Sequence, residues 1–355
     1  MAGLCAAARA RELGGRPVVF EKGSRPGGSM RISSCVIWRY RTFERFRAEC
    51  PGGDPSLQRQ VFEHLDDGLD WLESLGVDVV YRETGNELTT GVRFEPESLT
   101  EALVRGAGEV RLEASAAPSA DEAVILATGG FQGNPALVAE YVAPAAPLSL
   151  RANRWSTGAG LGAGLERGAT LSGGMGEFYG RNMPDADVSE HAFVTAAQLY
   201  ARHALVLNEH GHEFLRQPVS WSETEVVQAT AQQPGASAWY LVTDEALRER
   251  VRGRTVSDMV ATAEAAGGTV LNPCDLPFPT PAGLVRGVRV RAAITHTIGG
   301  LRIDERARVL AGDGSPIEGL YACGADVGGI STGGYASGLA AALVFGRIAA
   351  ENALS

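Results

Sequence analysis

The C-terminal part of the chain carries the clearest pattern of apolar and small residues. An apolar strand from Gly319 to Cys323 leads into a glycine-rich turn that continues to Gly334. A helix of small and apolar residues follows and extends through Ala349. A strand, a glycine-rich turn and a helix in this order direct the helix N-terminus at a buried anionic or electron-rich group. The pattern therefore predicts a cofactor-binding segment.

The N-terminal pattern is typical of a dinucleotide-binding fold. Ala2 and Gly3 open an alanine-rich helix, and an apolar strand, Val18–Phe20, leads to Glu21. In such folds the last glycine of the Gly-x-Gly-x-x-Gly loop allows helix and strand to pack closely, and an acidic residue about 20 positions later binds the ribose hydroxyls. Gly3 and Glu21 have this spacing.

The middle of the chain has its own strands and helices. A buried strand, Ala123–Ala127, ends in a turn with the sequence Thr-Gly-Gly-Phe. Runs of apolar residues and helical periodicity then predict further elements. These are strands at Ala204–Asn208 and Ala238–Thr243, and helices at Asp244–Val251 and Thr255–Ala266.

The N-terminal segment, the strand Ala123–Ala127 with its turn, and the C-terminal segment resemble motifs of the fumarate reductase/succinate dehydrogenase flavoprotein family, in its tricarballylate dehydrogenase and 3-ketosteroid dehydrogenase branch. They also follow one another along the chain in the order that the family has. The resemblance implies an α/β fold: a Rossmann-like FAD-binding domain, residues 1–134 and 291–355, interrupted by an α+β capping domain for the substrate, residues 135–290. It also implies the residues that bind FAD. They are Ala2, Gly3, Glu21, Lys22, Gly27, Gly28, Ser29, Ala127, Thr128, Gly129, Gly324, Ala325, Asp326, Gly338 and Leu339.

The N-terminal segment matches the family only in part. Met1 stands at the fourth position of the glycine loop, so the first strand and the first two glycines of the motif are absent from this sequence. Two interpretations are open: a gene start placed too late, or a chain that has lost tight cofactor binding. Residues 113–121 form a polar linker that is too short for the small antiparallel meander the family usually has there.

Composition and charge narrow the possible partners. With 355 residues, 45% hydrophobic and 21% charged, the chain can bury a large core and is expected to form two domains. The net charge of -10 argues against a nucleic-acid partner. No apolar run approaches the length of a membrane span, and charged residues at positions 9, 11 and 12 interrupt the N-terminal apolar stretch, unlike a signal peptide.

The cysteines indicate a reduced, cytoplasmic protein. All five are scattered, without a Cys-x-x-Cys pair or metal-ligand spacing, so no metal site is expected. They are Cys5, Cys35, Cys50, Cys274 and Cys323. A haem-attachment motif is also absent, so electrons are expected to come from or go to a separate partner.

Two departures from the family concern its substrate. Alignment of the motifs puts Trp221 in place of the arginine that protonates the substrate carbon in fumarate reductases, and Ser331 in place of an arginine that binds a substrate carboxylate. Guanidinium groups give planar, bidentate recognition of carboxylates. Their absence predicts a substrate other than fumarate or succinate.

The candidate catalytic residues are His296, Tyr335 and Tyr179. His296 lies in a segment that resembles the family's His-x-Thr-Met-Gly-Gly motif, and would hydrogen-bond a substrate carbonyl or exchange a proton; a purely structural histidine is equally open. Tyr335 precedes the C-terminal helix, where relatives that act on ketosteroids have a carbonyl-polarising tyrosine, although a packing role is open. Tyr179 would line the substrate side, unless it belongs to an ordinary loop.

The resemblance implies an enzyme that transfers hydride between flavin N5 and a carbon of an activated C–C bond in a carbonyl-bearing small molecule. No histidine follows Gly28 at the position that succinate dehydrogenases use for covalent attachment, so FAD is expected to be non-covalent. The alternative is a degenerate flavoprotein-like binding protein without redox turnover. A nicotinamide-dependent dehydrogenase is weaker still, because the C-terminal segment has no role in such enzymes.

Overall fold

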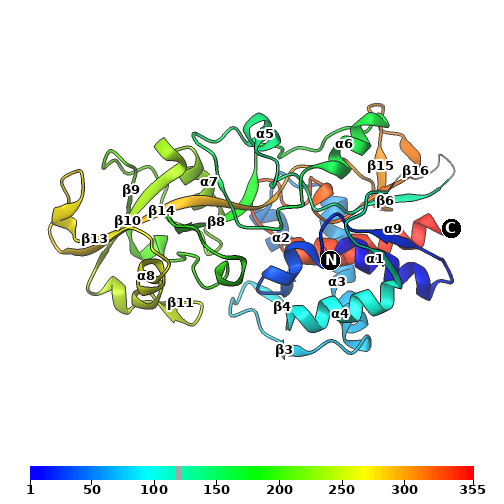
Figure 1. The fold of residues 1–355 in the computed structure, drawn as a ribbon, viewed down its shortest axis with the longest axis horizontal. Coiled ribbons are helices and arrows are strands. Elements are labelled where there is room, and N and C mark those ends of the chain that lie inside the picture. Colours follow the sequence, from blue (N-terminus) through cyan, green and yellow to red (C-terminus); the bar gives the residue numbers. More distant parts are fainter. Residues whose placement is uncertain (117–121) are drawn as a thin grey trace. The chain divides into compact units, whose positions relative to one another are not determined.

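The chain forms two compact units. The computed structural model describes residues 1–116 and 122–355, so residues 117–121 of the predicted linker at 113–121 lie outside the described residues. Unit 1 comprises residues 1–137, 153–177 and 296–355, and unit 2 comprises residues 138–152 and 178–295. Helices and several sheets alternate along the chain (Figure 1), which confirms the predicted α/β class.

Unit 1 contains the segments predicted to bind the cofactor. Its helices are α1 (Ala2–Glu12), α2 (Phe43–Glu49), α3 (Pro55–Ser74), α4 (Pro96–Ala107), α5 (Pro135–Leu137), α6 (Ala159–Glu166) and α9 (Gly338–Ala353), with short helices η1 (Gly28–Ile32) and η8 (Gly324–Asp326). Its strands are β1 (Val18–Phe20), β2 (Val36–Tyr40), β3 (Val79–Tyr81), β4 (Thr89–Phe94), β5 (Glu109–Arg111), β6 (Val124–Leu126), β15 (Arg308–Leu310) and β16 (Pro316–Ala322).

Two short parallel strand pairs lie in unit 1. β1 pairs with β5, with Val19 opposite Val110, and β6 pairs with β16, with Ile125 opposite Tyr321. β15 adds to β16 in the antiparallel direction, and a separate antiparallel sheet has the order β2-β4-β3. The loops after β6 and β16 leave at the same edge because the two strands are parallel (Figure 1).

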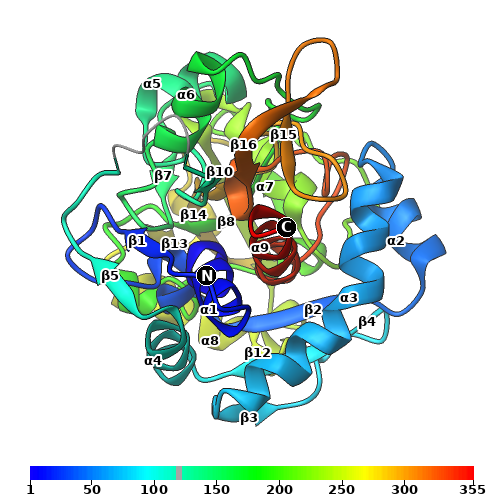
Figure 2. The same ribbon diagram turned by 90° about the vertical axis from the view of Figure 1, so that its right-hand side faces the viewer.

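Helix α1 packs between α4 and α9 (Figure 2) through small residues. A β-carbon at position 346 of α9 would lie 2.7 Å from the carbonyl oxygen of Ala2, and one at position 106 of α4 would lie 2.9 Å from Cβ of Ala8. The helices can approach this closely only because both positions are glycine. On the remaining side, Gly3 lies against Ala127, just after β6, as expected for a helix and strand that pack closely.

Unit 2 is built around one sheet. Its strands are β7 (Ser149–Leu150), β8 (Phe178–Pro184), β9 (Leu205–Leu207), β10 (Ser237–Thr243), β11 (Arg250–Val251), β12 (Arg254–Thr255), β13 (Val270–Leu271) and β14 (Leu284–Thr297), which continues into unit 1. Its helices are η2 (Val138–Val142), η3 (Glu190–Ala192), η4 (Ala201–His203), α7 (Thr224–Ala231), η5 (Pro234–Ala236), η6 (Ala246–Arg248), α8 (Val256–Ala265) and η7 (Pro273–Asp275). The sheet has the order β13-β14-β10-β9, and β7 and β8 pair with β14 further along that strand.

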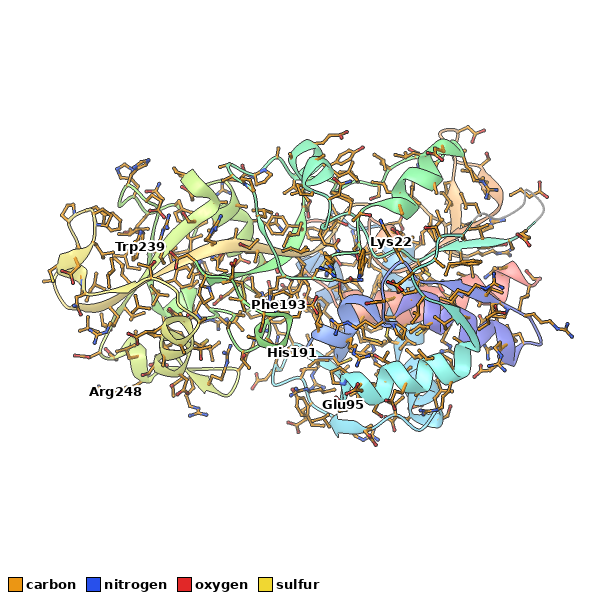
Figure 3. All side chains as sticks on the ribbon, viewed as in Figure 1. Lys22, Glu95, His191, Phe193, Trp239 and Arg248 are labelled. Atoms are coloured by element: carbon orange, nitrogen blue, oxygen red, sulfur yellow. The ribbon has the colours of Figure 1, made fainter. Side chains whose placement is uncertain are left out.

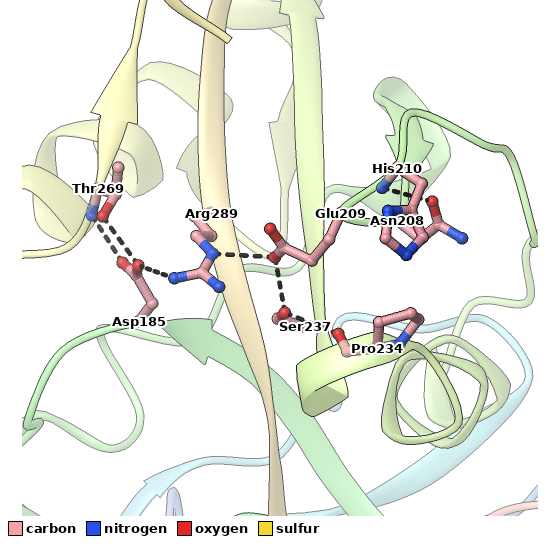
Figure 4. Close-up of polar contacts among 8 residues, drawn as sticks. All are labelled: Asp185, Asn208, Glu209, His210, Pro234, Ser237, Thr269 and Arg289. Carbon is pink, nitrogen blue, oxygen red and sulfur yellow. Dashed lines mark hydrogen bonds and ion pairs between the residues drawn. The ribbon is translucent and has the colours of Figure 1, made fainter. Parts of the chain in front are cut away.

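Apolar packing and an ionic network stabilise this sheet. Trp239 on β10 (Figure 3) lies in an apolar cluster with Leu207, Leu241 and Leu276. The polar network is centred on Arg289 of β14 (Figure 4), which donates to Glu209 at 2.9 Å and to Asp185 at 3.3 Å. Asp185 also accepts the Thr269 amide, and Glu209 accepts the Ser237 hydroxyl, so the network connects residues beside β8, β9, β10 and β13.

One predicted helix of unit 2 is wrong. Residues 244–251 contain only the short helix η6, and Arg250–Val251 then form strand β11, which pairs with β12 across Gly253. Gly253 has φ of 84°, a conformation that favours glycine and allows a tight hairpin. The next predicted helix is confirmed as α8, where Thr255 and Asp258 cap each other's backbone amides.

Candidate functional site

One buried carboxylate ties the loop after β6 to the segment after β16. Asp326, in η8, is 1% exposed. Its carboxylate accepts hydrogen bonds from Thr128 Oγ1 (2.9 Å), the Gly130 amide (3.2 Å), the Gly129 amide (3.3 Å) and the Thr128 amide. Burial raises the pKa of Asp326, and these hydrogen bonds oppose the increase. The structure thus brings two of the predicted cofactor segments together.

The side chains of Asp326 and Thr128, here called the carboxylate clamp, are already hydrogen-bonded within the protein. Thr128 Oγ1 both donates to Asp326 and accepts a hydrogen bond from the Gly160 amide at 2.9 Å. The clamp therefore positions the loops that carry Ala127, Gly129, Gly324 and Ala325, and its own oxygens are engaged in protein hydrogen bonds.

Two helix N-termini belong to the same part of unit 1. α1 begins at Ala2 without a side-chain cap, and α9, which packs on it, begins at Gly338. A β-carbon at position 324 would lie 2.9 Å from Cβ of Ala2, so the turn after β16 passes close to the start of α1. First-turn amides have no acceptor within the helix and, with the helix dipole, favour anionic or electron-rich groups. The predicted residues that supply such amides are Ala2, Gly3, Gly338 and Leu339.

Glu21 and Lys22 follow β1, as predicted. Glu21 Oε1 accepts a hydrogen bond from the Gly23 amide at 2.7 Å. Lys22 Nζ (Figure 3) donates one to Thr157 Oγ1 at 3.0 Å, also within unit 1. The acidic side chain is therefore held at the end of β1, where a ribose-binding residue is expected.

The predicted loop Gly27-Gly28-Ser29 has a conformation that needs glycine. Gly27 and Gly28 have φ of 103° and 56°, both in the left-handed region. Ser29 Oγ accepts a hydrogen bond from the Asn153 amide at 3.0 Å, which ties the loop to the second segment of unit 1.

His296 lies at the end of β14, against the start of α9. A β-carbon at position 338 would lie 3.1 Å from Cε1 of its imidazole. Desolvation lowers the pKa of His296 to about 4, and the positive end of the α9 dipole also disfavours a cation there. His296 is therefore neutral at pH 7, able to donate one hydrogen bond and accept another, but a poor proton acceptor.

Two polar atoms near Gly130 are buried without a hydrogen-bond partner among the residues that the structure describes. They are Thr297 Oγ1 and Gln132 Oε1. A β-carbon at Gly130 would lie 2.7 Å from the first atom and 2.9 Å from the second, so both border the same place. Buried polar atoms in native proteins almost always have partners, which points to a polar ligand or water at this place.

Tyr335 lies three residues before Gly338, in the loop that leads into α9. Its ring makes an edge contact with Trp38, with centroids 5.4 Å apart, and its carbonyl accepts the Tyr40 hydroxyl at 2.6 Å. These contacts fasten the loop to β2. Both Tyr335 and His296 thus flank the start of α9 within unit 1.

Tyr179 is on β8 in unit 2. The Arg181 guanidinium lies 4.8 Å from the centre of its ring, a cation–π contact. Tyr179 thus belongs to unit 2, whereas His296 and Tyr335 belong to unit 1.

Sequence reasoning missed a buried polar cluster in unit 2. Glu223, at the N-terminus of α7, is 5% exposed, and burial raises its pKa to about 7, against the lowering effect of Arg181, Arg202 and Arg252. Tyr200 beside it is fully buried. A Ser-Glu-Thr-Glu sequence before a helix is typical of an exposed cap, so no local signal pointed to a buried acid.

Trp221, aligned with the family's catalytic arginine, has an arginine beside it in space. The Arg252 guanidinium lies 5.8 Å from the centre of its indole ring and donates to its carbonyl at 3.2 Å. Arg252 is in the turn between β11 and β12. A guanidinium therefore lies near this position, but it is engaged with the backbone of the Trp221 segment.

Within residues 1–116 and 122–355, no three histidine, cysteine, aspartate or glutamate side chains gather as metal ligands would. In the same part of the chain, no helix combines the length and apolar character needed to cross a membrane.

The chain is similar to curated fumarate reductases. It is 25% identical to the NADH:fumarate oxidoreductase of Klebsiella pneumoniae (strain 342), over 99% of this chain and 46% of the relative. It is 26% identical to a probable fumarate reductase of Shewanella frigidimarina (strain NCIMB 400), over 65% of this chain and 44% of the relative. The chain thus spans about half the length of these curated relatives.

Solved structures share the fold. The open conformation of a flavocytochrome c3 fumarate reductase matches with a TM-score of 0.72 and 22% identity, over 99% of this chain and 76% of that one. The 3-ketosteroid-Δ4-(5α)-dehydrogenase of Rhodococcus jostii RHA1, in complex with 4-androstene-3,17-dione, matches with a TM-score of 0.70 and 18% identity, over 100% of this chain and 95% of that one.

A family model described as an FAD binding domain matches residues 88–338, which is more than half of the chain. This match confirms the predicted flavoprotein family and FAD as its cofactor, and both reductases and dehydrogenases are among its relatives. The chain therefore belongs to the FAD binding domain family.

Proposed function

We propose that this chain is an FAD-dependent oxidoreductase that transfers hydride between flavin N5 and a carbon of an activated C–C bond in a carbonyl-bearing small molecule. The observation that carries the proposal is the neutral imidazole of His296, which lies against the start of α9. Two further buried polar atoms of unit 1, Thr297 Oγ1 and Gln132 Oε1, border Gly130. Structural neighbours include a fumarate reductase and a ketosteroid dehydrogenase, both of which act on such bonds.

The residues of unit 1 fit FAD. The first-turn amides of α1, at Ala2 and Gly3, would bind pyrophosphate oxygens, and the Glu21 carboxylate would bind ribose hydroxyls. The first-turn amides of α9, at Gly338 and Leu339, would lie at the electron-rich pyrimidine end of the flavin. Unit 1 is accordingly proposed as the cofactor unit and unit 2 as the substrate unit. Bound FAD supplies the hydride donor or acceptor.

The chain's own residues would orient the substrate carbonyl. A neutral imidazole donates one hydrogen bond without adding charge, so His296 would polarise a carbonyl oxygen and favour enolate character as the C–C bond reacts. Tyr335 is a second candidate donor, held near the start of α9 by its contacts with Trp38 and Tyr40.

The proposed substrate is not fumarate or succinate. Ser331 supplies no guanidinium, His296 is neutral at pH 7, and the guanidinium of Arg252 donates to the carbonyl of Trp221. Two carboxylates would therefore enter without the bidentate cations that usually compensate their desolvation.

The proposed electron partner is a separate protein or small carrier, and the proposed location is the reducing cytoplasm. Four of the five cysteines are buried, and all five are free thiols. Burial raises the pKa of Cys5, Cys35 and Cys50 to about 12, so these thiols remain protonated and unreactive.

The test is anaerobic reoxidation of the reduced, FAD-loaded chain. Flavin absorbance is followed after mixing with 4-androstene-3,17-dione as an enone, or with fumarate at the same concentration. The enone is expected to react roughly 100-fold faster or more, because each missing charged hydrogen bond to a carboxylate costs about a factor of ten. His296→Gln should slow the enone reaction roughly tenfold or more without slowing reduction by dithionite.

Faster reoxidation by fumarate would contradict the proposed substrate class. If the loaded chain reacts with no enone and no unsaturated acid, the alternative of a flavoprotein-like binding protein without turnover is favoured instead.

A further inference from the structure

Unit 1 contains a pair of buried side-chain oxygens whose surroundings belong to that unit alone. They are Oε1 of Gln132, in the loop after β6, and Oγ1 of Thr297, the last residue of β14. The exposed fractions of these residues are 4% and 1%. Neither oxygen has a hydrogen-bond partner within residues 1–116 and 122–355. Since buried polar atoms are almost always satisfied, the pair indicates a place that is built for hydrogen-bonding groups of a bound molecule.

Gly130 leaves both oxygens accessible at this place. A β-carbon at position 130 would lie 2.7 Å from Thr297 Oγ1, 2.9 Å from Gln132 Oε1 and 3.1 Å from the carbonyl oxygen of Ala325. The first two distances are shorter than packed atoms tolerate, so a larger residue would displace or cover the two oxygens. Gly130 also has φ of 83°, a conformation that favours glycine.

Backbone hydrogen bonds fix the loop that carries Gln132. Its Nε2 donates to the carbonyl of Gly129 at 2.9 Å, which directs Oε1 away from that carbonyl. The Gly130 amide donates to Asp326 at 3.2 Å, and the Gly130 carbonyl accepts the Gly158 amide at 2.9 Å. The acceptor oxygen of Gln132 is therefore held in place before any molecule binds, which lowers the entropic cost of binding.

The pair lies along a line of contacts between the N-termini of α1 and α9. On one side, Gly324 precedes the carbonyl that borders the pair, and a β-carbon at position 324 would lie 2.9 Å from Cβ of Ala2. On the other side, His296 precedes Thr297, and its imidazole lies against Gly338 at the start of α9. All of these residues belong to unit 1.

The chemistry of the two oxygens selects the group that would bind them. A glutamine Oε1 only accepts hydrogen bonds, whereas a threonine hydroxyl donates one and accepts others. A phosphate, which offers acceptor oxygens, and an apolar group would both leave Gln132 Oε1 unpaired. A hydroxyl group can donate to Gln132 and also pair with Thr297, so an alcohol is the ligand chemistry that satisfies both.

We propose that Gln132 and Thr297 bind the ribityl chain of FAD. Gln132 Oε1 would accept a hydrogen bond from one ribityl hydroxyl, and Thr297 Oγ1 would pair with the same hydroxyl or its neighbour. The ribityl chain is the hydroxyl-bearing part of FAD between the pyrophosphate, assigned to the start of α1, and the flavin ring, assigned to the start of α9. This inference rests on the proposed assignment of unit 1 as the cofactor unit, and neither residue was among those predicted to bind FAD.

The chain without FAD already distinguishes this role from a structural one. Thr297→Val keeps the shape of the side chain and removes a buried hydroxyl that has no partner among the described residues, so the Tm of the FAD-free chain should not fall. The matched control is Thr89→Val in β4 of unit 1. Thr89 is 2% exposed, and its hydroxyl donates to the carbonyl of Asn86 at 3.3 Å. This variant should therefore lower the Tm.

The main test is isothermal titration with FAD and with deoxy analogues of FAD that each lack one ribityl hydroxyl. Thr297→Val is expected to raise the Kd for FAD roughly fivefold or more, because a ribityl hydroxyl is left buried without its partner. For the analogue that lacks this hydroxyl, the same substitution should change Kd by less than about twofold.

Gln132→Met, a substitution of similar length that removes the acceptor, should show the same selective loss with the analogue of the hydroxyl that it binds. Its effect is read only from the comparison of FAD with the analogues, because the substitution also removes the hydrogen bond to Gly129. Thr89→Val should have the Kd of the parent chain for FAD and for every analogue.

The inference is overturned if Thr297→Val and Gln132→Met raise Kd by the same factor for FAD and for every analogue, since the pair then holds a water molecule only or supports the fold. It is also overturned if Thr297→Val lowers the Tm of the FAD-free chain as much as Thr89→Val does. A parent chain that binds no FAD overturns the proposed cofactor unit itself, and the inference with it. The failures are distinguishable because the first two are observed with a parent chain that binds FAD.

Discussion

At the scale of single residues, burial decides the chemistry. Glu223 and His296 are both shifted toward their neutral forms, one by a raised pKa of about 7 and the other by a lowered pKa of about 4. At pH 7 the histidine is thus limited to hydrogen bonding, and the glutamate is the group that can titrate. The sequence alone offered His296 for hydrogen bonding or proton exchange, because unperturbed histidine titrates near neutrality, and it did not single out Glu223.

The raised pKa of Glu223 makes stability depend on pH. Its carboxyl has a pKa of about 7 in the folded chain and 4.5 when unperturbed, so between these values the unfolded chain has lost the proton that the folded chain retains. The contribution of Glu223 to the free energy of unfolding therefore falls as pH rises from 4.5 to 7, by about 3 kcal/mol in total. Urea unfolding from pH 4.5 to pH 8 should show the loss in the parent chain and its absence in Glu223→Gln. Equal pH dependence of the two proteins would contradict the raised pKa.

The carboxylate of Asp326 holds the loop after β6 through the hydrogen bonds that it accepts. Asp326→Asn retains one acceptor oxygen but replaces the other by an amide donor, so backbone amides of the loop after β6 lose a partner. Unfolding free energy should fall by about 1–3 kcal/mol, and the Kd for FAD should rise roughly tenfold or more because the loops of both segments move apart. Isothermal titration with FAD measures the second effect. The control is Asp313→Asn, an exposed turn residue, and equal Kd values for the two variants would contradict the role of the clamp.

At the scale of elements, small residues determine how the helices of unit 1 pack. Gly346→Ala would place a β-carbon 2.7 Å from the carbonyl of Ala2, so α9 and α1 must separate. Thermal unfolding should show a loss of about 1–3 kcal/mol. Gly162→Ala on α6 is the matched control, because no atom lies within 4 Å of its β-carbon, and helix propensity should make it neutral or stabilising by about 0.5–1 kcal/mol. A Gly346→Ala variant as stable as the control would contradict this packing.

The elements of unit 1 could be predicted from the sequence because their signals are local. Glycine turns and apolar runs located α1, β6, β16 and α9 to within a few residues. Local signals failed at residues 244–251, where the hairpin through Gly253 overrides helical periodicity. They also failed at Glu223, whose burial depends on arginines from β8, η4 and the β11–β12 turn. Contacts between residues distant in sequence leave no mark in a local pattern.

At the scale of the whole molecule, the match to the FAD binding domain family, residues 88–338, includes residues of both units. Unit 1 offers two helix N-termini and an acid after β1, the groups that an anionic dinucleotide requires. The predicted site residues are compatible with this function, and their individual roles remain predictions.

The most direct test of the central claim is the visible absorption spectrum of the purified chain after incubation with FAD and removal of unbound FAD. We expect flavin bands that are shifted from those of free FAD, with a stoichiometry of one FAD per chain, and that bleach on anaerobic reduction and return on addition of an enone. A chain without flavin bands after this treatment would contradict the assignment of unit 1 as a cofactor-binding unit.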